Sequence, residues 1–249
     1  FEKHGVTNIE GTDTYNACYG GTNAFLNTMN WFASSSYNGK YGIVVASDIA
    51  VVGNQYAFSS GGSCVAMLLG PNGQLELTSK RASYMSDTWD FYKPVGWKEM
   101  TPIVDMRNAT GCYMTALKGC LKEFVPNENK EMFIDNYDYI VFHSTSNYLA
   151  KMAFETMYNW TKGTALTKED ELVSKLYNEK VGVSMELCKR TGSNYTAAVY
   201  TNLLSLCLHN DMKNKKILVF SYGSGCASTI YELNAHDKPS YLPNAVQYL

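Results

Sequence analysis

A cysteine beside two glycines is the first residue whose chemistry stands out in this sequence. Cys18 lies in the segment NACYGG, where an apolar stretch without a single hydrophobic stripe predicts a buried helix over 17–36. The free amides and the dipole of a helix N-terminus stabilise a thiolate, and glycines let a substrate approach the backbone closely. We therefore interpret Cys18 as a candidate nucleophile. The alternative is a small buried side chain beside a tight turn.

A histidine at the end of a predicted strand is a candidate partner for this cysteine. His143 directly follows the strand predicted over 137–142. Reactive groups gather at the carboxyl ends of strands in open α/β sheets, and a cysteine with a histidine is suited to acyl transfer. His143 is therefore a candidate acid–base group. A structural histidine in a turn is the alternative.

Other polar loop residues are weaker candidates. The amides around Ser224, in the turn GSG, would suit an oxyanion hole at the end of a strand. The small-residue segment Ser59 to Gly62 is comparable and is more simply interpreted as a turn. Asp48 and Asp105 are isolated carboxylates, for which a helix cap or a solvated surface is the simpler interpretation.

The elements that must position these residues follow an α/β pattern. Periodic or apolar stretches predict helices over 17–36, 110–124, 147–160, 168–180 and 195–209, and strands over 41–46, 63–69, 137–142 and 217–220. The run 41–46 is almost entirely apolar and β-branched, as in a strand covered on both faces. The segment 81–106 has no clear period.

One unit occurs twice along the chain. The unit is an apolar helix, followed by a short polar loop and an apolar strand. Its first copy ends near residue 46 and its second near residue 220, roughly 175 residues later. An internal duplication would produce this pattern, and so would chance in an α/β protein. We predict a layered sheet with buried central helices.

The composition excludes several classes of protein. The 249 residues are 45% hydrophobic and 18% charged with a net charge of −2, so the chain is globular and has no field that attracts nucleic acid or a membrane surface. The seven cysteines form no CxxC pair, which suits neither a disulfide framework nor a zinc site and favours a reduced, intracellular protein. No apolar run is long enough to span a bilayer. Because the chain begins at Phe1, we expect a piece of a longer protein.

Several segments together resemble the hydroxymethylglutaryl-CoA synthase family. They are IEGTDTYNACYGGTNAFLNTMNW, GKYGIVVASDIAV, WDFYKP, PIVD, FHS and FSYGSG, which occur in the family's order across nearly the whole chain. The resemblance implies an α/β thiolase-like fold of two duplicated layered halves with buried central helices. Residues 1–77 would then be the remainder of the N-terminal half, and 78–249 the C-terminal half, truncated at its C-terminus.

The resemblance also implies a reaction. Cys18 would take the acetyl group of acetyl-CoA as a thioester, and a glutamate from a missing N-terminal part would remove a methyl proton. The enolate would attack the ketone of acetoacetyl-CoA, positioned by His143, which would stabilise or protonate the alkoxide. Amides near Cys18 and Ser224 would hold the acetyl oxygen, and water would release hydroxymethylglutaryl-CoA. CoA thioesters are substrates in this scheme, no cofactor or metal is implied, and the intact enzyme is expected to be a cytoplasmic homodimer.

The sequence departs from the family around the substrate carbonyl. In the family a Gly-Asn-x-Tyr-Thr string supplies an asparagine that hydrogen-bonds this carbonyl. Here Ser193 occupies that place and Asn194 comes one position late. One step along a helix rotates a side chain by about 100°, so Asn194 replaces it only if the helix start shifts. Ser60 stands where the family has threonine.

The sequence also departs from the family at the CoA phosphates. The family's phosphate-binding lysines align with Tyr148 and Met152, and Lys151 is the only nearby cation. Two alternatives to the synthase therefore stay open. The chain could belong to another condensing enzyme of the thiolase fold with a different acyl acceptor, or to a catalytically degenerate paralogue that keeps the fold as a binding subunit.

Overall fold

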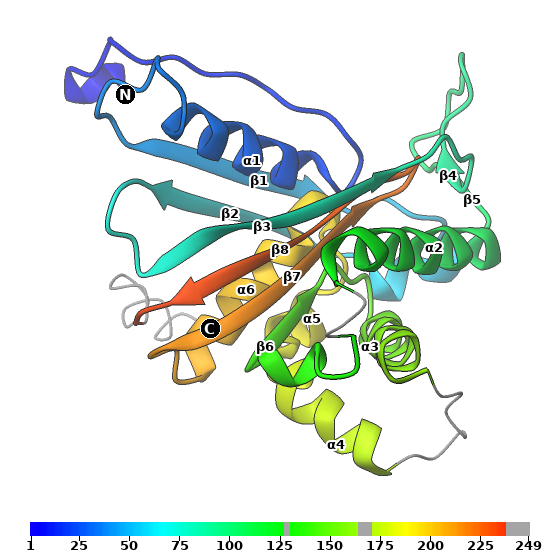
Figure 1. The fold of residues 1–249 in the computed structure, drawn as a ribbon. Coiled ribbons are helices and arrows are strands. Elements are labelled where there is room, and N and C mark those ends of the chain that lie inside the picture. The colour runs from blue at the N-terminus through cyan, green and yellow to red at the C-terminus, as the bar shows by residue number, and fades with distance from the viewer. Residues whose placement is uncertain (127–129, 164–170, 238–249) are drawn as a thin grey trace.

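A four-stranded mixed sheet lies at the centre of the fold (Figure 1). In the computed structural model, which describes residues 1–126, 130–163 and 171–237, its strands have the order β3, β8, β7, β6. The pair β6 and β7 is parallel, and the other two pairs are antiparallel. The strands are β3 Leu75–Met85, β6 Tyr139–Phe142, β7 Lys215–Gly223 and β8 Ala227–Ala235.

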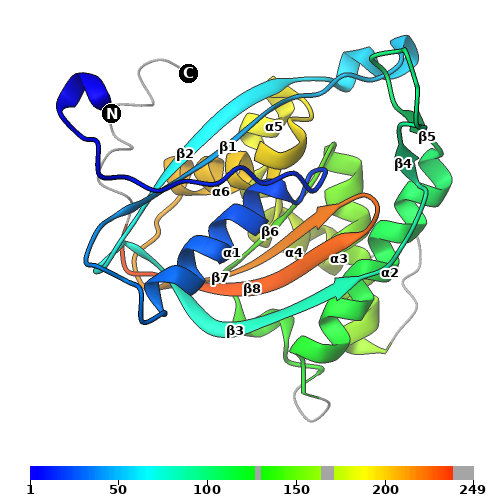
Figure 2. The ribbon, with the colours of Figure 1, turned by 90° about the horizontal axis from the view of Figure 1, so that it is seen from above.

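Helices cover both faces of this sheet. Leu218 and Phe220 of β7 pack into one hydrophobic cluster with α2 and α3, whereas Ile217 and Val219 pack into a second cluster with α1 and α6. Covering on both faces explains why this strand is continuously apolar. Figure 2 shows α1 between the central sheet and the strands β1, Gly42–Ile49, and β2, Gly62–Leu69. The helices are α1 Gly20–Phe32, α2 Met106–Phe124, α3 Asn147–Lys162, α4 Glu171–Lys180, α5 Glu186–Thr191 and α6 Ala198–His209.

Two further strand pairs flank this arrangement. The hairpin of β1, Gly42–Ile49, and β2, Gly62–Leu69, is antiparallel, and a short pair joins β4, Phe91–Tyr92, to β5, Ile103–Val104. The prediction that β1 is covered on both faces is wrong for the described residues. Val44 and Ala46 pack against α1 and α6, while Ile43 and Val45 on the other face are more than half exposed.

The predicted helices are confirmed in place, with shifted ends. The helix predicted from residue 110 begins at Met106, because the Asp105 side chain accepts hydrogen bonds from the amides of Arg107 and Asn108, both at 3.1 Å. Asp105 is therefore a helix cap, as expected. The charged helix predicted over 168–180 is α4 from Glu171 onward, and its first three residues lie outside the described part of the chain.

Among the described residues, four strands and one α-helix were not predicted. They are β3, β4, β5, β8 and α5. The strand β8 is almost completely buried but carries Ser228, Thr229 and Glu232, so its sequence lacks the apolar run that identifies a buried strand. The predicted boundary between 1–77 and 78–249 falls inside β3 and stays a prediction.

The predicted repeat is visible in the backbone. Ala17 precedes α1 and Tyr195 precedes α6, and both residues have a left-handed φ of 44°. Each helix then leads through a loop to a strand, β1 in the first unit and β7 in the second. The two helix starts meet, since the amide of Gly21 donates to Thr196 Oγ1 at 2.6 Å. The fold thus consists of two related units packed helix against helix.

Candidate active site

The turn that carries Cys18 lies against the end of β7. The amide of Tyr19 donates to the carbonyl of Asn16 at 2.9 Å, and Cys18 between them is only 8% exposed. A Cβ atom placed on Gly223 would lie 2.6 Å from the nitrogen of Tyr19 and 3.0 Å from the oxygen of Asn16. Only glycine therefore lets the end of β7 approach the cysteine turn this closely.

The glycines after Cys18 serve packing between helices. A Cβ on Gly21 would lie 2.9 Å from both the carbonyl oxygen of Thr196 and the Cβ of Ala46. A Cβ on Gly20 would lie 3.3 Å from Thr196 Oγ1. The expectation that these glycines open the backbone to a substrate is therefore wrong. They let the start of α1 contact the start of α6 and the strand β1.

The environment of Cys18 favours the protonated thiol, contrary to the expectation of a stabilised thiolate. Burial, followed by the negative charge of Asp48, raises the pKa of Cys18 to about 12. The hydrogen bond from its own amide opposes this rise but does not cancel it. The amides at the start of α1 have other acceptors, because Gly20 donates to the carbonyl of Ala17 and Gly21 donates to Thr196. The amides of Gly20 and Gly21 are therefore not free to stabilise a thiolate.

His143 lies at the carboxyl end of β6, as predicted. Its amide donates to the carbonyl of Phe220 in β7 at 2.7 Å, and its carbonyl accepts from the hydroxyl of Tyr113 at 2.7 Å. Burial lowers the pKa of the imidazole to about 4, so His143 is neutral near pH 7. Its Nδ1 atom has no hydrogen-bond partner among the described residues.

The loop before α6 brings Ser193 and Asn194 into the buried interior. Ser193 pairs with Ser60 through a backbone bridge, and its amide donates to the carbonyl of Ser59 at 2.7 Å. The side-chain nitrogen Nδ2 of Asn194 donates to Thr191 Oγ1 at 3.1 Å, whereas Ser193 Oγ has no partner in the described part of the chain. Ser193, and not Asn194, therefore carries the uncommitted polar atom of this loop.

A buried carboxylate that sequence reasoning missed supports the loop of Ser224. Asp90 is fully buried and accepts from the hydroxyl of Tyr222 and from the amide of Gly225, both at 3.1 Å, and from Thr88 Oγ1 at 2.9 Å. Ser224 itself is half-buried. The segment WDFYKP contained Asp90, but its local pattern gave no sign of a partner more than 130 residues away.

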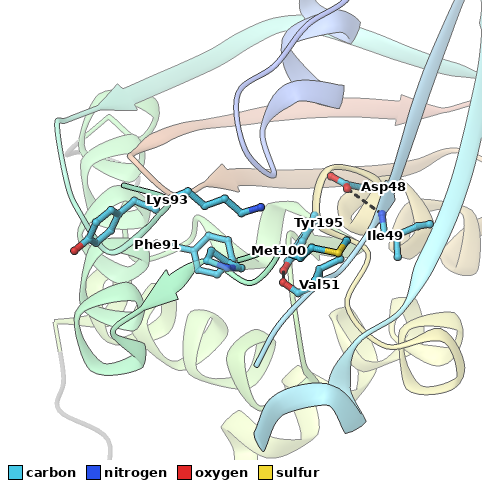
Figure 3. A pocket seen from close by; sticks show the side chains of 9 residues that line it. Asp48, Ile49, Val51, Phe91, Lys93, Met100 and Tyr195 are labelled. Atoms are coloured by element: carbon cyan, nitrogen blue, oxygen red, sulfur yellow. Dashed lines mark hydrogen bonds between the residues drawn. The ribbon is translucent and has the colours of Figure 1, made fainter. Parts of the chain in front are cut away.

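A pocket of about 360 Å³ opens beside the cysteine turn (Figure 3). Its wall includes Asp48, whose charge acts on Cys18, and Tyr195, whose pKa is raised to about 12 by burial and then by the charge of Cys18. Lys93 extends toward these two residues (Figure 3). Asp48 is half-buried at the edge of this pocket, so the interpretation of it as a solvated surface carboxylate stays a prediction. The lining residues are Asp48, Ile49, Val51, Phe91, Tyr92, Lys93, Met100, Pro102 and Tyr195.

The predicted phosphate-binding residue lies elsewhere. Lys151 is exposed on α3, one turn after the exposed Tyr148, and does not line this pocket. No cluster of three or more His, Cys, Asp or Glu side chains within the described ranges could hold a metal ion. None of the seven cysteines, all of which the structure describes, forms a disulfide. Among the described helices, none has the length and apolarity needed to cross a membrane.

Solved structures share this fold. The structure of MvaS in complex with 3-hydroxy-3-methylglutaryl coenzyme A is 25% identical, with a TM-score of 0.79, and the match covers 94% of this chain and 60% of that one. The curacin pathway HMG synthase in complex with apo donor-ACP has a TM-score of 0.84 at 22% identity, covering 99% and 59% of the two chains. The thiolase-like fold expected from the sequence is confirmed.

Sequence comparisons give the family. Hydroxymethylglutaryl-CoA synthase B of Dictyostelium discoideum is 35% identical over 95% of this chain and 58% of its own length. The cytoplasmic hydroxymethylglutaryl-CoA synthase of Homo sapiens is 34% identical over 94% and 53%. The chain thus spans somewhat more than half the length of these relatives. The family model for the N-terminal part of hydroxymethylglutaryl-coenzyme A synthase matches residues 1–74, and the model for the C-terminal part matches 75–173 and 160–243. The chain therefore belongs to the hydroxymethylglutaryl-CoA synthase family.

Proposed function

We propose that the protein condenses acetyl-CoA with acetoacetyl-CoA to hydroxymethylglutaryl-CoA through an acetyl thioester on Cys18. The observation that carries this proposal is the position of Cys18, buried in a tight turn against the Gly223 end of β7 and beside the pocket of Asp48 and Tyr195. Family membership supports the same reaction. The synthase belongs to the mevalonate pathway, and its substrates are CoA thioesters.

The first chemical step must include removal of the thiol proton. Because the pKa of Cys18 is about 12, the thiol is protonated near pH 7 and needs a base as it attacks the thioester of acetyl-CoA. The carbon–sulfur bond to CoA breaks, and CoA leaves with a proton as a thiol. Loss of a methyl proton to the glutamate expected outside this chain then gives the enolate for carbon–carbon bond formation. Water finally cleaves the thioester to Cys18 and leaves a carboxylate.

The remaining site residues are assigned by their positions. His143 is neutral and offers one ring nitrogen to the acetoacetyl group, and Ser193 has a free hydroxyl for a carbonyl oxygen. The amides of Cys18 and Ser224 are proposed to hold the acetyl oxygen. Lys151, exposed on α3, is proposed to meet a CoA phosphate together with solvent.

Two broader properties belong to the same proposal. The chain is expected to act in the cytoplasm, which the name of the human relative supports, and as a homodimer. Both rest on the resemblance, and the expected reduced state of the cysteines supports the cytoplasmic location alone.

Product analysis separates this proposal from the two alternatives. The full-length protein is incubated with acetyl-CoA and acetoacetyl-CoA, and the products are identified by mass spectrometry. Hydroxymethylglutaryl-CoA that disappears in Cys18→Ala supports the synthase. Acetylation of Cys18 without this product favours a condensing enzyme with another acyl acceptor, and the absence of both favours a degenerate paralogue.

A further inference from the structure

Two buried polar atoms without partners belong to side chains that are linked through the peptide group between Phe142 and His143. Within the described residues, His143 Nδ1 and Asn202 Oδ1 have no hydrogen-bond partner. Asn202 is completely buried in α6, and its Nδ2 atom donates to the carbonyl oxygen of Phe142 at 3.0 Å. Since Phe142 directly precedes His143, this bond holds the carboxamide one peptide group from the imidazole. A buried polar atom in a native protein normally has a partner, so these two orphans require an explanation.

The orientation of the Asn202 carboxamide is fixed by this contact. A backbone carbonyl only accepts hydrogen bonds, so the amide nitrogen must face Phe142 and Oδ1 must face away from it. The helix around Asn202 is also held, because Thr201 hydrogen-bonds Ser63 at 3.2 Å and Ser205 Oγ accepts from the amide of Leu187 at 3.2 Å. Asn202 therefore presents a stationary acceptor.

The main chain of His143 is held equally firmly, which leaves only its ring to adjust. Both its amide and its carbonyl are hydrogen-bonded, to Phe220 and Tyr113 respectively. Val141, two residues earlier, packs in the hydrophobic cluster that contains α6. The alternation of side chains along β6, continued one residue past its last residue Phe142, directs the His143 side chain toward the face of Val141 and α6. The centroid of its ring lies 6.4 Å from that of Tyr222.

We propose that Asn202 is a positioning residue whose Oδ1 atom accepts a hydrogen bond from Nδ1–H of His143. The proton on Nδ1 then stays in place in both the neutral and the charged ring, and Nε2 is the only ring atom that exchanges a proton with the substrate. The hydrogen bond at one ring nitrogen of a histidine determines the proton state of the other. This inference rests on the proposed function for the role of Nε2, but the hydrogen bond itself does not.

Nitrogen NMR of the full-length protein labelled with ¹⁵N-histidine tests the hydrogen bond. The signal of His143 is assigned by its loss in His143→Gln. We expect a protonated Nδ1 and an unprotonated Nε2 near pH 7, and a shift toward the Nε2–H form, which neutral histidine prefers in water, in Asn202→Ala. Asn202→Asp gives up the bond to the Phe142 carbonyl but keeps an oxygen acceptor, whose negative charge is expected to hold a proton on Nδ1. It also provides a second variant if Asn202→Ala does not fold.

A matched control lies at the end of the same helix. Asn210 donates to the carbonyl of Leu206 at 3.1 Å, away from His143, so Asn210→Ala is expected to leave the ring signal unchanged. An Nε2–H ring in the wild type, or an unchanged tautomer in Asn202→Ala, would overturn the inference.

Kinetics provide the second readout. Asn202→Ala is expected to lower kcat of condensation by about ten- to a hundredfold, the range found for partners that orient metal-bound histidines, with acetylation of Cys18 unchanged. Equal losses in both steps would mean a merely structural role. If Cys18 is never acetylated while the tautomer still responds to Asn202, the proposed function fails and the hydrogen bond stands. If Cys18 is acetylated and the tautomer does not respond, only the hydrogen bond fails.

Discussion

The amide of Gly21 donates to the hydroxyl of Thr196 at 2.6 Å and thereby joins the two halves of the fold across 175 residues of sequence. Thr196 lies before α6, and Gly21 is the second residue of α1. The threonine thus satisfies an amide that the helix itself leaves without a partner. The same contact takes that amide away from the neighbouring Cys18.

Removal of this acceptor should destabilise the protein. Thr196→Val keeps the shape but leaves the Gly21 amide without its acceptor, which should lower the free energy of unfolding by about 1–3 kcal/mol. Urea denaturation measures this change. Thr196→Ser keeps the hydroxyl and is the matched control. Equal stability of the valine and serine variants would show that the hydrogen bond contributes nothing.

A methyl group at Gly21 should be more harmful than one at an open helical glycine. Gly21→Ala would place Cβ 2.9 Å from Thr196 and Ala46, and overpacking of this kind costs about 1–3 kcal/mol. A Cβ on Gly111 in α2 would meet no atom within 4 Å, so Gly111→Ala should stabilise the protein by up to about 1 kcal/mol. Thermal unfolding of the two variants should therefore shift in opposite directions. A Gly21→Ala protein as stable as the wild type contradicts the packing described for α1 and α6.

Reactivity of Cys18 should rise only at high pH. Burial and Asp48 raise its pKa to about 12, so alkylation by iodoacetamide should increase with pH well beyond the ordinary value of 9. Asp48→Asn removes the negative charge and should lower this pKa, which makes Cys18 more reactive at a given pH. Asp13→Asn, an exposed change, is the control. A rate that levels off below pH 9 would contradict the raised pKa.

Stability should fall in acid because of His143. Burial lowers its pKa from 6.5 to about 4, so the unfolded chain binds a proton at a pH where the folded protein does not. The full free energy of unfolding is present above pH 6.5. As the pH falls toward 4, it decreases by roughly 3 kcal/mol, because each unit of difference between the folded and unfolded pKa corresponds to about 1.4 kcal/mol. Urea unfolding between pH 7 and pH 4 measures it. His143→Gln should show a shallower loss, and an equally steep loss would assign the effect to other groups.

Local patterns located the two main candidates but not their chemistry. The glycine-rich start of a buried helix placed Cys18 in a tight turn, and the apolar strand before His143 placed that residue at a strand end, as the structure confirms. The protonation of Cys18 was predicted in the wrong direction, because the acceptor of the Gly21 amide and the charge of Asp48 come from other parts of the chain. Such long-range partners leave no trace in a local pattern.

The missed strand β8 shows a related limit. Its buried polar side chains have distant partners: the hydroxyl of Thr229 bonds that of Tyr19 at 2.6 Å, and Glu232 accepts from the hydroxyl of Tyr137 at 3.0 Å. Because these partners come from other elements, the strand is polar where a buried strand is expected to be apolar. Asp90 and Asn202 were missed for the same reason, since each pairs with groups far away in the sequence.

Transfer of an isotope-labelled acetyl group to Cys18 is the most direct measurement of the proposed function. The full-length protein is mixed with acetyl-CoA carrying a ¹³C-labelled acetyl group, quenched in acid and digested with pepsin for mass spectrometry. We predict the labelled acetyl mass on the peptide that contains Cys18, its absence in Cys18→Ala, and its retention in Cys64→Ser, which removes an exposed thiol. Label that persists in Cys18→Ala, or no label on the Cys18 peptide of the active protein, would contradict a thioester at this residue.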